Sequence, residues 1–253
     1  MANDILPLLK TSASSIAPNA LVMGDPARVK VAAGLLDEAQ EVGNNREYLT
    51  YTGALHGVPI TLASHGIGSG GAAVCFEELA RAGVKTIIRT GTCGGLQAPV
   101  DDGDFVIATG ALRNEGLTER LVPLMYPAVA HYEVVNALLQ ASAAAAKVGV
   151  PGSTHTGLVM SSDVFYPSEI MPIDWKVWTK VHVAAVEMEL SALLIISALH
   201  GIRAGGIFTA DGNLTRENVA ADFSDYSPHR QIVKDATARM LQIALDALVS
   251  LAK

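Results

Sequence analysis

The stretch VPITLASHGIGSGGAAVCFEELARAGVKTIIRTGTCGG, residues 58–95, decides the fold class of this chain. Its opening apolar run, 58–63, has the length of a buried strand and is followed by a glycine-rich turn at 65–71. Residues 72–82 predict a helix capped by Gly83, and 86–89 predict a second strand that ends at the glycine-rich segment 91–95. Strand, helix and strand in this order indicate an α/β domain.

The same alternation continues toward both ends of the chain. Strands are also predicted at 20–23, 105–111 and 204–210, and helices at 27–36, at 132–148 and after Glu187. The C-terminal helix carries apolar residues at helical spacing: Ile232, Ala236, Met240, Ile243, Ala247 and Leu251. We find no internal repeat or linker, so we expect residues 1–253 to form one α/β domain with a largely parallel or mixed sheet.

Composition and charge exclude several classes of protein. Half of the residues are hydrophobic, 17% are charged, and the net charge is -7. An acidic chain is a poor match for nucleic acid or an anionic membrane, so neither is expected as a partner. Cys75 and Cys93 do not make a disulfide framework, and the histidines lack metal-ligand spacing, so no metal site is expected. Without a signal peptide or an apolar stretch of roughly 20 residues, a reducing cytoplasm is the expected location.

The first candidate anion site is the segment Gly24-Asp25-Pro26-Ala27-Arg28, where a strand runs into a helix. Free backbone N–H groups, the helix dipole and a guanidinium together favour an anion. The segment is equally well explained as a plain turn, with Asp25 as the helix N-cap and Pro26 in the first turn. That simpler interpretation leaves Gly24 and Arg28 unexplained.

The segment 64–71 carries a different signal, because Gly66, Gly68 and Gly71 fit the pattern G-x-G-x-x-G. A dinucleotide-binding oxidoreductase is therefore a competing interpretation, and it expects an acidic residue about 20 positions later at the tip of the next strand. That tip carries Arg89 instead, which weakens the interpretation, although an arginine could serve a 2′-phosphate. Arg89 with Thr92 and the flexible backbone of 91–95 favours a phosphate cradle over a glycine turn with a surface arginine.

Two acidic motifs occur in the C-terminal half. Glu187 and Glu189 flank Met188, and they suit the hydroxyls and the apolar face of a sugar, although acidic residues at a helix start are common. Asp211 ends a hydrophobic strand, where partial burial would raise its pKa as a proton donor requires. Local sequence alone favours an Asp-Gly turn there. Phe165 could stack on a base or pack in the core.

In their order along the chain these motifs resemble the nucleoside phosphorylase family that includes uridine phosphorylases and hexameric purine nucleoside phosphorylases, above all those of apicomplexan parasites. The resemblance runs from about Leu21 to the C-terminal helix. The matching stretches are 24–28, Asn45-Arg46-Glu47-Tyr48, 64–68, 89–94, Ser161-Ser162-Asp163-Val164-Phe165-Tyr166-Pro167, 186–189 and Asp211-Gly212. The resemblance implies a mixed, twisted, barrel-like central sheet flanked by helices.

The resemblance also implies a role for each motif. The residues implied to hold phosphate are Gly24, Arg28, Arg89 and Thr92, with Arg46 reaching in from a neighbouring subunit. The residues implied to bind ribose are Met188 and Glu189, with Glu187 nearby. The residues implied to contact the base are Phe165, Cys93, Gly94 and Val186. Asp211 is implied to protonate N7 of a purine while phosphate attacks C1′ of the ribose, with no metal or organic cofactor.

Two departures from the family pattern bear on the substrate. Uridine phosphorylases carry a glutamine and arginine pair shortly after the Phe-Tyr-Pro stretch, whereas this chain has Ser168-Glu169-Ile170-Met171-Pro172. A purine is therefore favoured over uridine. Near the N-terminus, relatives supply a histidine to the 5′-hydroxyl from the neighbouring subunit, and the matching position here is Leu8. We expect looser recognition of the 5′-hydroxyl.

Several alternatives stay open at this point. A uridine phosphorylase or a 5′-methylthioadenosine phosphorylase would use the same fold, and a non-catalytic nucleoside-binding protein is a further class. The expected reaction is the reversible phosphorolysis of inosine or guanosine, and the expected assembly is a homo-hexamer, a trimer of dimers with sites shared across the dimer interface. The polar stretch 213–223 after Asp211 is expected to be mobile.

Overall fold

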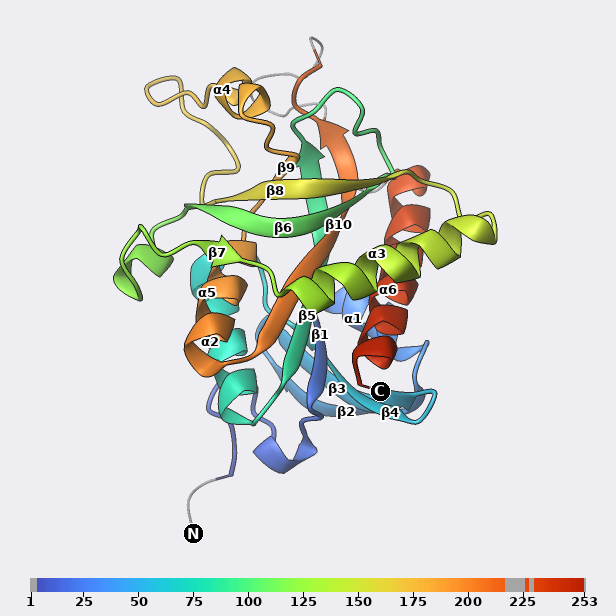
Figure 1. Ribbon diagram of the computed structural model, residues 1–253. Helices are drawn as coiled ribbons and strands as arrows, with labels where there is room; N and C mark the ends of the chain where they lie inside the picture. Colours follow the sequence, from blue (N-terminus) through green and yellow to red (C-terminus); the bar gives the residue numbers. More distant parts are fainter. Residues whose placement is uncertain (1–3, 217–225, 228–229, 253) are drawn as a thin grey trace.

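The computed structural model describes residues 4–216, 226–227 and 230–252, and its strands form one 10-stranded mixed sheet (Figure 1). The strands are β1 (Asn19–Met23), β2 (Asp37–Asn45), β3 (Tyr48–Leu55), β4 (Val58–Ser64), β5 (Thr86–Gly95), β6 (Phe105–Asn114), β7 (Ala128–Val129), β8 (Thr154–Ser162), β9 (Ala185–Glu187) and β10 (Arg203–Asn213). The helices are α1 (Pro26–Ala33), α2 (Ser69–Arg81), α3 (Tyr132–Lys147), α4 (Trp175–Lys180), α5 (Leu190–His200) and α6 (Gln231–Leu251), with short 3-10 turns at Ala13–Ser15 and Thr118–Arg120. Of the stretch 213–223, residues 217–223 lie outside the described residues.

The long strand β5 is the hub of the sheet. It pairs in parallel with β1 on one side and with β10 on the other, and its last residues pair with β9. The remaining pairings run from β10 through β6 and β8 back to β9, so five strands close into a ring. Strands β4, β3 and β2 extend the sheet beyond β1. The predicted α/β fold with a mixed, barrel-like sheet is confirmed.

Helices cover the sheet from two sides (Figure 1). Helices α2 and α5 pack together in one apolar cluster, which includes Phe76 and Leu193. Helices α1, α3 and α6 pack in a second cluster, which includes Val29, Leu138 and Met240. Most of the apolar stripe predicted for the C-terminal helix is buried in this second cluster, from Ala236 to Ala247, with Leu251 packed against it. Ile232 is the exception, because it lies in the first turn of the helix and is half exposed.

The structure confirms the predicted strands and helices and corrects one expectation. The segment 91–95 was expected to be a loop, but β5 continues through it to Gly95. Its glycines allow the chain to stay extended while Arg89 and two neighbouring strands approach closely; a Cβ on Gly91, for example, would lie 2.5 Å from Nη1 of Arg89. The phosphate cradle expected there is therefore the end of a rigid strand.

Candidate active site

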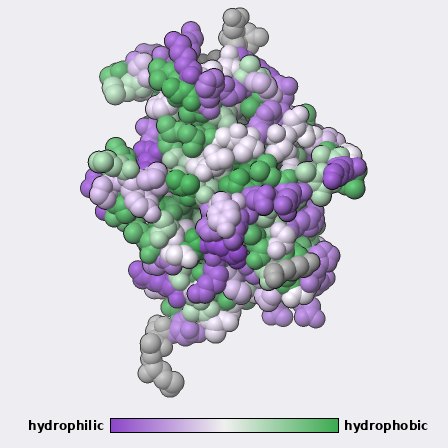
Figure 2. All heavy atoms as spheres, viewed as in Figure 1, coloured by the Kyte–Doolittle hydropathy of each residue, from purple (hydrophilic) through white to green (hydrophobic). Residues whose placement is uncertain are grey.

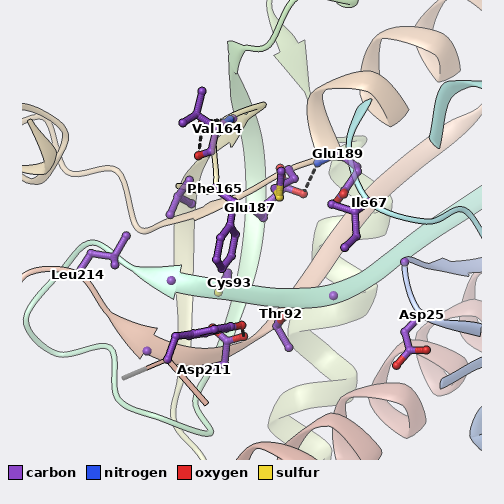
Figure 3. Close-up of a pocket in the computed structure, with 18 of the residues that line it drawn as sticks. Asp25, Ile67, Thr92, Cys93, Val164, Phe165, Glu187, Glu189, Asp211 and Leu214 are labelled. Atoms are coloured by element: carbon purple, nitrogen blue, oxygen red, sulfur yellow. Dashed lines mark hydrogen bonds between the residues drawn. The ribbon is translucent and has the colours of Figure 1, made fainter. Parts of the chain in front are cut away.

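A cavity of about 1280 Å³ opens where the parallel strands β1, β4, β5 and β10 end (Figure 3). Polar loops at the carboxyl ends of parallel strands are where ligands bind in α/β proteins. Every residue predicted for the site lines this cavity except Arg46. The residues brought together are Gly24, Arg28, Arg89, Thr92, Cys93, Gly94, Phe165, Val186, Glu187, Met188, Glu189 and Asp211.

One end of the cavity is built around Arg89, whose side chain is 4% exposed. Its Nη2 bonds to Glu189 and lies 3.5 Å from Glu187, while Nε and Nη1 have no hydrogen-bond partner among the described residues. A buried donor without a partner costs free energy unless a ligand or water satisfies it. The arrangement therefore suits an anion in the cavity.

The segment 24–28 forms the helix-capping turn, and the anion site stays a prediction. Asp25 caps α1 by accepting from the N–H of Ala27 at 2.8 Å, and Pro26 occupies the first turn. Gly24 and Arg28, which that turn leaves unexplained, line the cavity. A Cβ on Gly24 would lie 3.0 Å from the carbonyl oxygen of Gly66, so the two loops pack too closely for a side chain.

The G-x-G-x-x-G segment serves a different purpose from dinucleotide binding. The N–H of Gly68 donates to Oε1 of Glu189 at 2.6 Å, and the hydroxyl of Ser69 donates to the carbonyl oxygen of Met188 at 2.9 Å. These contacts tie the start of α2 to the segment 187–189. The N–H of Gly68 and the hydroxyl of Ser69 therefore hold the Glu187-Met188-Glu189 motif in place.

The two glutamates of that motif are both buried and share the charge of Arg89. Burial raises the pKa of Glu187, with Arg89 opposing; for Glu189, burial is outweighed by the charges of Arg89 and His65, which lower its pKa. Glu187 also accepts the N–H groups of Glu189 and Leu190 at 2.9 Å each, and so it caps the start of α5. The oxygens of both glutamates are therefore engaged by protein groups, those of Glu187 at the start of α5 and those of Glu189 by Gly68 and Arg89.

Asp211 lies at the other end of the cavity and is 5% exposed. The pairing of β10 with β5 shifts register between Ala210 and Gly212, so Asp211 occupies a bulge that aims its side chain into the site. Burial raises the pKa of Asp211, and hydrogen bonds from Tyr226 and Thr92 and the charge of Arg28 oppose the rise. The carboxyl thus holds a proton at a higher pH than an exposed aspartate does.

Apolar side chains enclose the space beside Asp211. Figure 3 shows Phe165 directed toward Cys93 and Asp211. Burial raises the pKa of the Cys93 thiol well above its usual value, so the thiol is a neutral wall. Val186 and Leu214 complete the enclosure, which fits a flat heterocycle.

Two residues singled out by the resemblance lie outside the cavity of their own chain. Arg46 is exposed in the tight turn between β2 and β3, with φ +56°, whereas its neighbour Glu47 lines the cavity. Leu8 is partly buried, and its N–H is held by the carboxylate of Glu78 at 2.8 Å. Neither side chain contributes to the site within one chain.

Several other residues of the cavity were not predicted from the sequence. These residues are Tyr226 and Arg230, which lie in irregular segments, and Trp175, which begins the short helix α4. Tyr226 lies 15 positions after Asp211 in a polar stretch without periodicity. Within the described part of the chain, no group of three His, Cys, Asp or Glu residues is arranged to hold a metal ion, and no helix is long and apolar enough to cross a membrane.

Comparisons with known proteins agree with this geometry. The sequence pattern of the phosphorylase superfamily matches residues 18–249. A guanosine phosphorylase of Halorubrum lacusprofundi is 38% identical over 92% of this chain and 93% of its own, and a purine nucleoside phosphorylase of Plasmodium vivax is 35% identical over 97% and 96%. The crystal structure of purine nucleoside phosphorylase from Toxoplasma gondii in complex with immucillin-H superposes with a TM-score of 0.90 at 30% identity, over 99% of this chain and 98% of the other. Uridine phosphorylases match as well, at 30–35% identity. This chain belongs to the phosphorylase superfamily.

Proposed function

We propose that this enzyme catalyses the reversible phosphorolysis of purine ribonucleosides to a free purine base and ribose 1-phosphate. The observation that carries the proposal is the arrangement within one cavity of a buried arginine with unpaired donors, a carboxylate pair and a buried aspartate of raised pKa. The relatives named guanosine phosphorylase and purine nucleoside phosphorylase, similar over more than nine-tenths of the chain, confirm the enzyme class predicted from the sequence.

In this proposal, different residues along the cavity bind the phosphate, the ribose and the base. Arg28, Arg89, Gly24 and Thr92 would hold inorganic phosphate as the co-substrate, and Met188 and Glu189 would hold the ribose above it. Asp211 would donate its proton to N7, so that the base leaves as a neutral species while a phosphate oxygen bonds to C1′. Catalysis then comes from positioning the nucleophile and from protonating the leaving group.

A purine is the proposed base because of the segment after Phe165. The side chains of Ser168, Glu169, Ile170 and Met171 are exposed, and none of them is the amide or guanidinium that would read the edge of uracil. Asp211, by contrast, is the residue that the family resemblance assigns to N7 of a purine. The runner-up substrates are uridine and 5′-methylthioadenosine, on the same fold.

We propose that the active enzyme is a homo-hexamer built as a trimer of dimers. Arg46 is exposed and outside the cavity of its own chain, so it would reach phosphate only in a neighbouring subunit. Large apolar side chains also project from the surface, among them Met125 (95% exposed) and Ile170 (89%). Figure 2 shows hydrophobic side chains on the projecting edges of the face it displays. Such surface is typical of subunit contacts.

The cytoplasmic location and the lack of a need for any cofactor stay predictions.

The test is base release from inosine, guanosine and uridine, each with and without phosphate, using enzyme treated with a chelator. Phosphate-dependent release from a purine nucleoside, with little from uridine, is the expected result. Release without phosphate would mean a hydrolase and would contradict the anion site around Arg89. Binding of nucleoside without any release would move the non-catalytic binding protein to the front.

A further inference from the structure

Asp211 has a protein partner that the mechanism above does not use. The hydroxyl of Tyr226 donates a hydrogen bond to Oδ2 of Asp211, with the two oxygens 2.6 Å apart. Tyr226 lines the same cavity and is partly buried. A tyrosine hydroxyl that donates to one oxygen of a buried carboxyl fixes the rotation of that carboxyl and leaves its second oxygen for another partner.

Arg230 links the backbone segments that carry Asp211 and Tyr226. Its Nη2 donates to the backbone oxygen of Asp211 at 2.7 Å, and its Nε donates to the backbone oxygen of Ser227 at 3.1 Å. Its Nη1 pairs with Asp102 at 2.5 Å. The guanidinium therefore links the end of β10 to the segment that carries Tyr226, and both are linked to the connection between β5 and β6.

The ring of Tyr226 is held as well. It meets the ring of Phe165 edge to face, with centroids 5.4 Å apart and planes at 65°. This contact is an ordinary favourable geometry for two aromatic rings. It places the hydroxyl at Asp211 through a rigid ring, and the ring remains if the hydroxyl alone is removed.

We propose that Tyr226 is a positioning residue for the general acid: its hydroxyl holds one carboxyl oxygen of Asp211, so that the proton is carried on the other oxygen toward the base. This inference rests on the proposed function, in which Asp211 protonates the leaving purine. In that step the O–H bond of Asp211 breaks and an N7–H bond forms, the electrons of the C1′–N9 bond stay with the base, and phosphate bonds to C1′. Asp211 becomes a carboxylate.

The hydrogen bond from Tyr226 contributes most when that negative charge develops. A bond to a neutral acid becomes a charge-assisted bond as the proton leaves, so it strengthens toward the transition state. Tyr226 stays protonated throughout, because burial and the nearby Asp211 raise its pKa. The other groups around Asp211 are the hydroxyl of Thr92, which also hydrogen-bonds to the carboxyl, the cations Arg28 and Arg230, and the buried, neutral thiol of Cys93.

The test is Tyr226→Phe, which removes the hydroxyl and keeps the ring against Phe165. We expect kcat for inosine to fall on the order of 10- to 100-fold, with a change in KM of less than about threefold, because the lost bond acts on developing charge. The alkaline limb of the pH profile should move to higher pH. The hydrogen bond stabilises the carboxylate and lowers the pKa of Asp211, so its loss raises that pKa, and an acid works only below its pKa.

Tyr132→Phe is the matched control, since its hydroxyl bonds to the carboxylate of Glu133 on the exposed start of α3 at 3.2 Å. It should leave both kcat and the pH profile unchanged. An unchanged alkaline limb in Tyr226→Phe, or a loss confined to KM, would overturn the positioning role and leave Tyr226 as a wall for the base.

A titration of the Asp211 carboxyl carbon by nuclear magnetic resonance, in wild type and Tyr226→Phe without substrate, separates this proposal from the proposed function. A higher pKa of Asp211 in the variant supports the bond, and equal pKa values refute it, whatever the enzyme turns over. Failure of the proposed function would show instead as a wild-type enzyme that releases no purine with phosphate.

Discussion

The two ends of the cavity are built from different kinds of backbone. At the end of the cavity around Arg89, which we propose holds phosphate and call the phosphate end, Gly24 and Gly66 follow the parallel strands β1 and β4, and Arg89 lies within the adjacent parallel strand β5. At the base end, Asp211 sits on a strand, but Phe165 and Tyr226 come from irregular segments between regular elements. The first end is rigid and charged, and the second is mostly apolar around one carboxyl.

Because of this difference, we expect substitutions at one end of the cavity to change the stability of the fold and substitutions at the other end to change the rate of the reaction. At the phosphate end, the charges of Arg89, Glu187 and Glu189 are buried and paired with one another, so a change of Arg89 acts on folding as well as on ligand binding. At the base end, the carboxyl of Asp211 is hydrogen-bonded to the hydroxyls of Tyr226 and Thr92 and lies near the cations Arg28 and Arg230, and we expect its replacement to act mainly on the chemical step. The variants below test that separation, from the largest expected effect to the smallest.

Asp211→Asn should give the largest loss. The amide keeps the size of the side chain but has no proton of suitable acidity to give, so kcat for inosine should fall by about 10²- to 10⁴-fold. Affinity for the nucleoside, measured by calorimetry without phosphate, should change far less. The alkaline limb that wild type shows as Asp211 loses its raised-pKa proton should also disappear. Equal losses in turnover and affinity would count against the acid role.

Arg89→Met should damage both folding and phosphate use. It leaves Glu187 and Glu189 buried without their cation, at a cost of about 3–5 kcal/mol in the free energy of unfolding, reduced to the extent that Glu187 takes up a proton. Urea denaturation and the KM for phosphate measure the two effects.

Arg28→Met is the matched variant at the same end of the cavity. The side chain of Arg28 is 24% exposed and its pairing with Asp25 is long, at 4.0 Å. It should raise the KM for phosphate with little loss of stability. If the two variants lost equal stability, the distinction between a buried and an open arginine would be wrong.

The contrast between the two ends also explains what the sequence could predict. Residues 58–95 combine regular strand and helix patterns with punctuating glycines, so the βαβ core and Arg89 follow from local rules. Gly24, Arg28 and the motif 187–189 were located in the same way, since each follows a strand or begins a helix. Their assignment to phosphate and ribose needed the resemblance to a family, because each has a simple structural explanation by itself.

The rest of the site depends on contacts between distant residues. The sequence around Tyr226 lacks the apolar periodicity of a helix or a strand. The hydrogen bond of Tyr226 to Asp211 depends on Arg230 and on the fold of β10. Strands β2 and β3 were not predicted either, because β2 is mostly exposed and polar and lacks the apolar alternation of a half-buried strand. The continuation of β5 through 91–95 depends on pairing with β9 and β10, which glycine-rich local sequence does not reveal.

Gly91→Ala tests the rigidity of the phosphate end with a single methyl group. Its Cβ would lie 2.5 Å from Nη1 of Arg89, so either the guanidinium or the strand must move. We expect a loss of about 1–3 kcal/mol in the free energy of unfolding and a higher KM for phosphate. Gly70→Ala is the control, because that helical glycine has no atom within 4 Å of a Cβ, and alanine there should stabilise by about 0.4–1 kcal/mol. A Gly91→Ala enzyme with unchanged phosphate KM would show that Arg89 is freer than its contacts indicate.

Leu8 bears on the smallest expected effect, recognition of the 5′-hydroxyl. A site that hydrogen-bonds a substrate hydroxyl rejects the analogue lacking it strongly, whereas a site without such a group discriminates weakly. We therefore expect kcat/KM for 5′-deoxyinosine to lie within about tenfold of that for inosine. Leu8→His should restore a preference for inosine, because the backbone of Leu8 is fixed by its N–H bonds to Glu78 at 2.8 and 3.1 Å and the new imidazole would keep the place of the leucine side chain. A strong demand for the hydroxyl in wild type would mean that another group binds it, and Leu8→His would then leave the ratio unchanged.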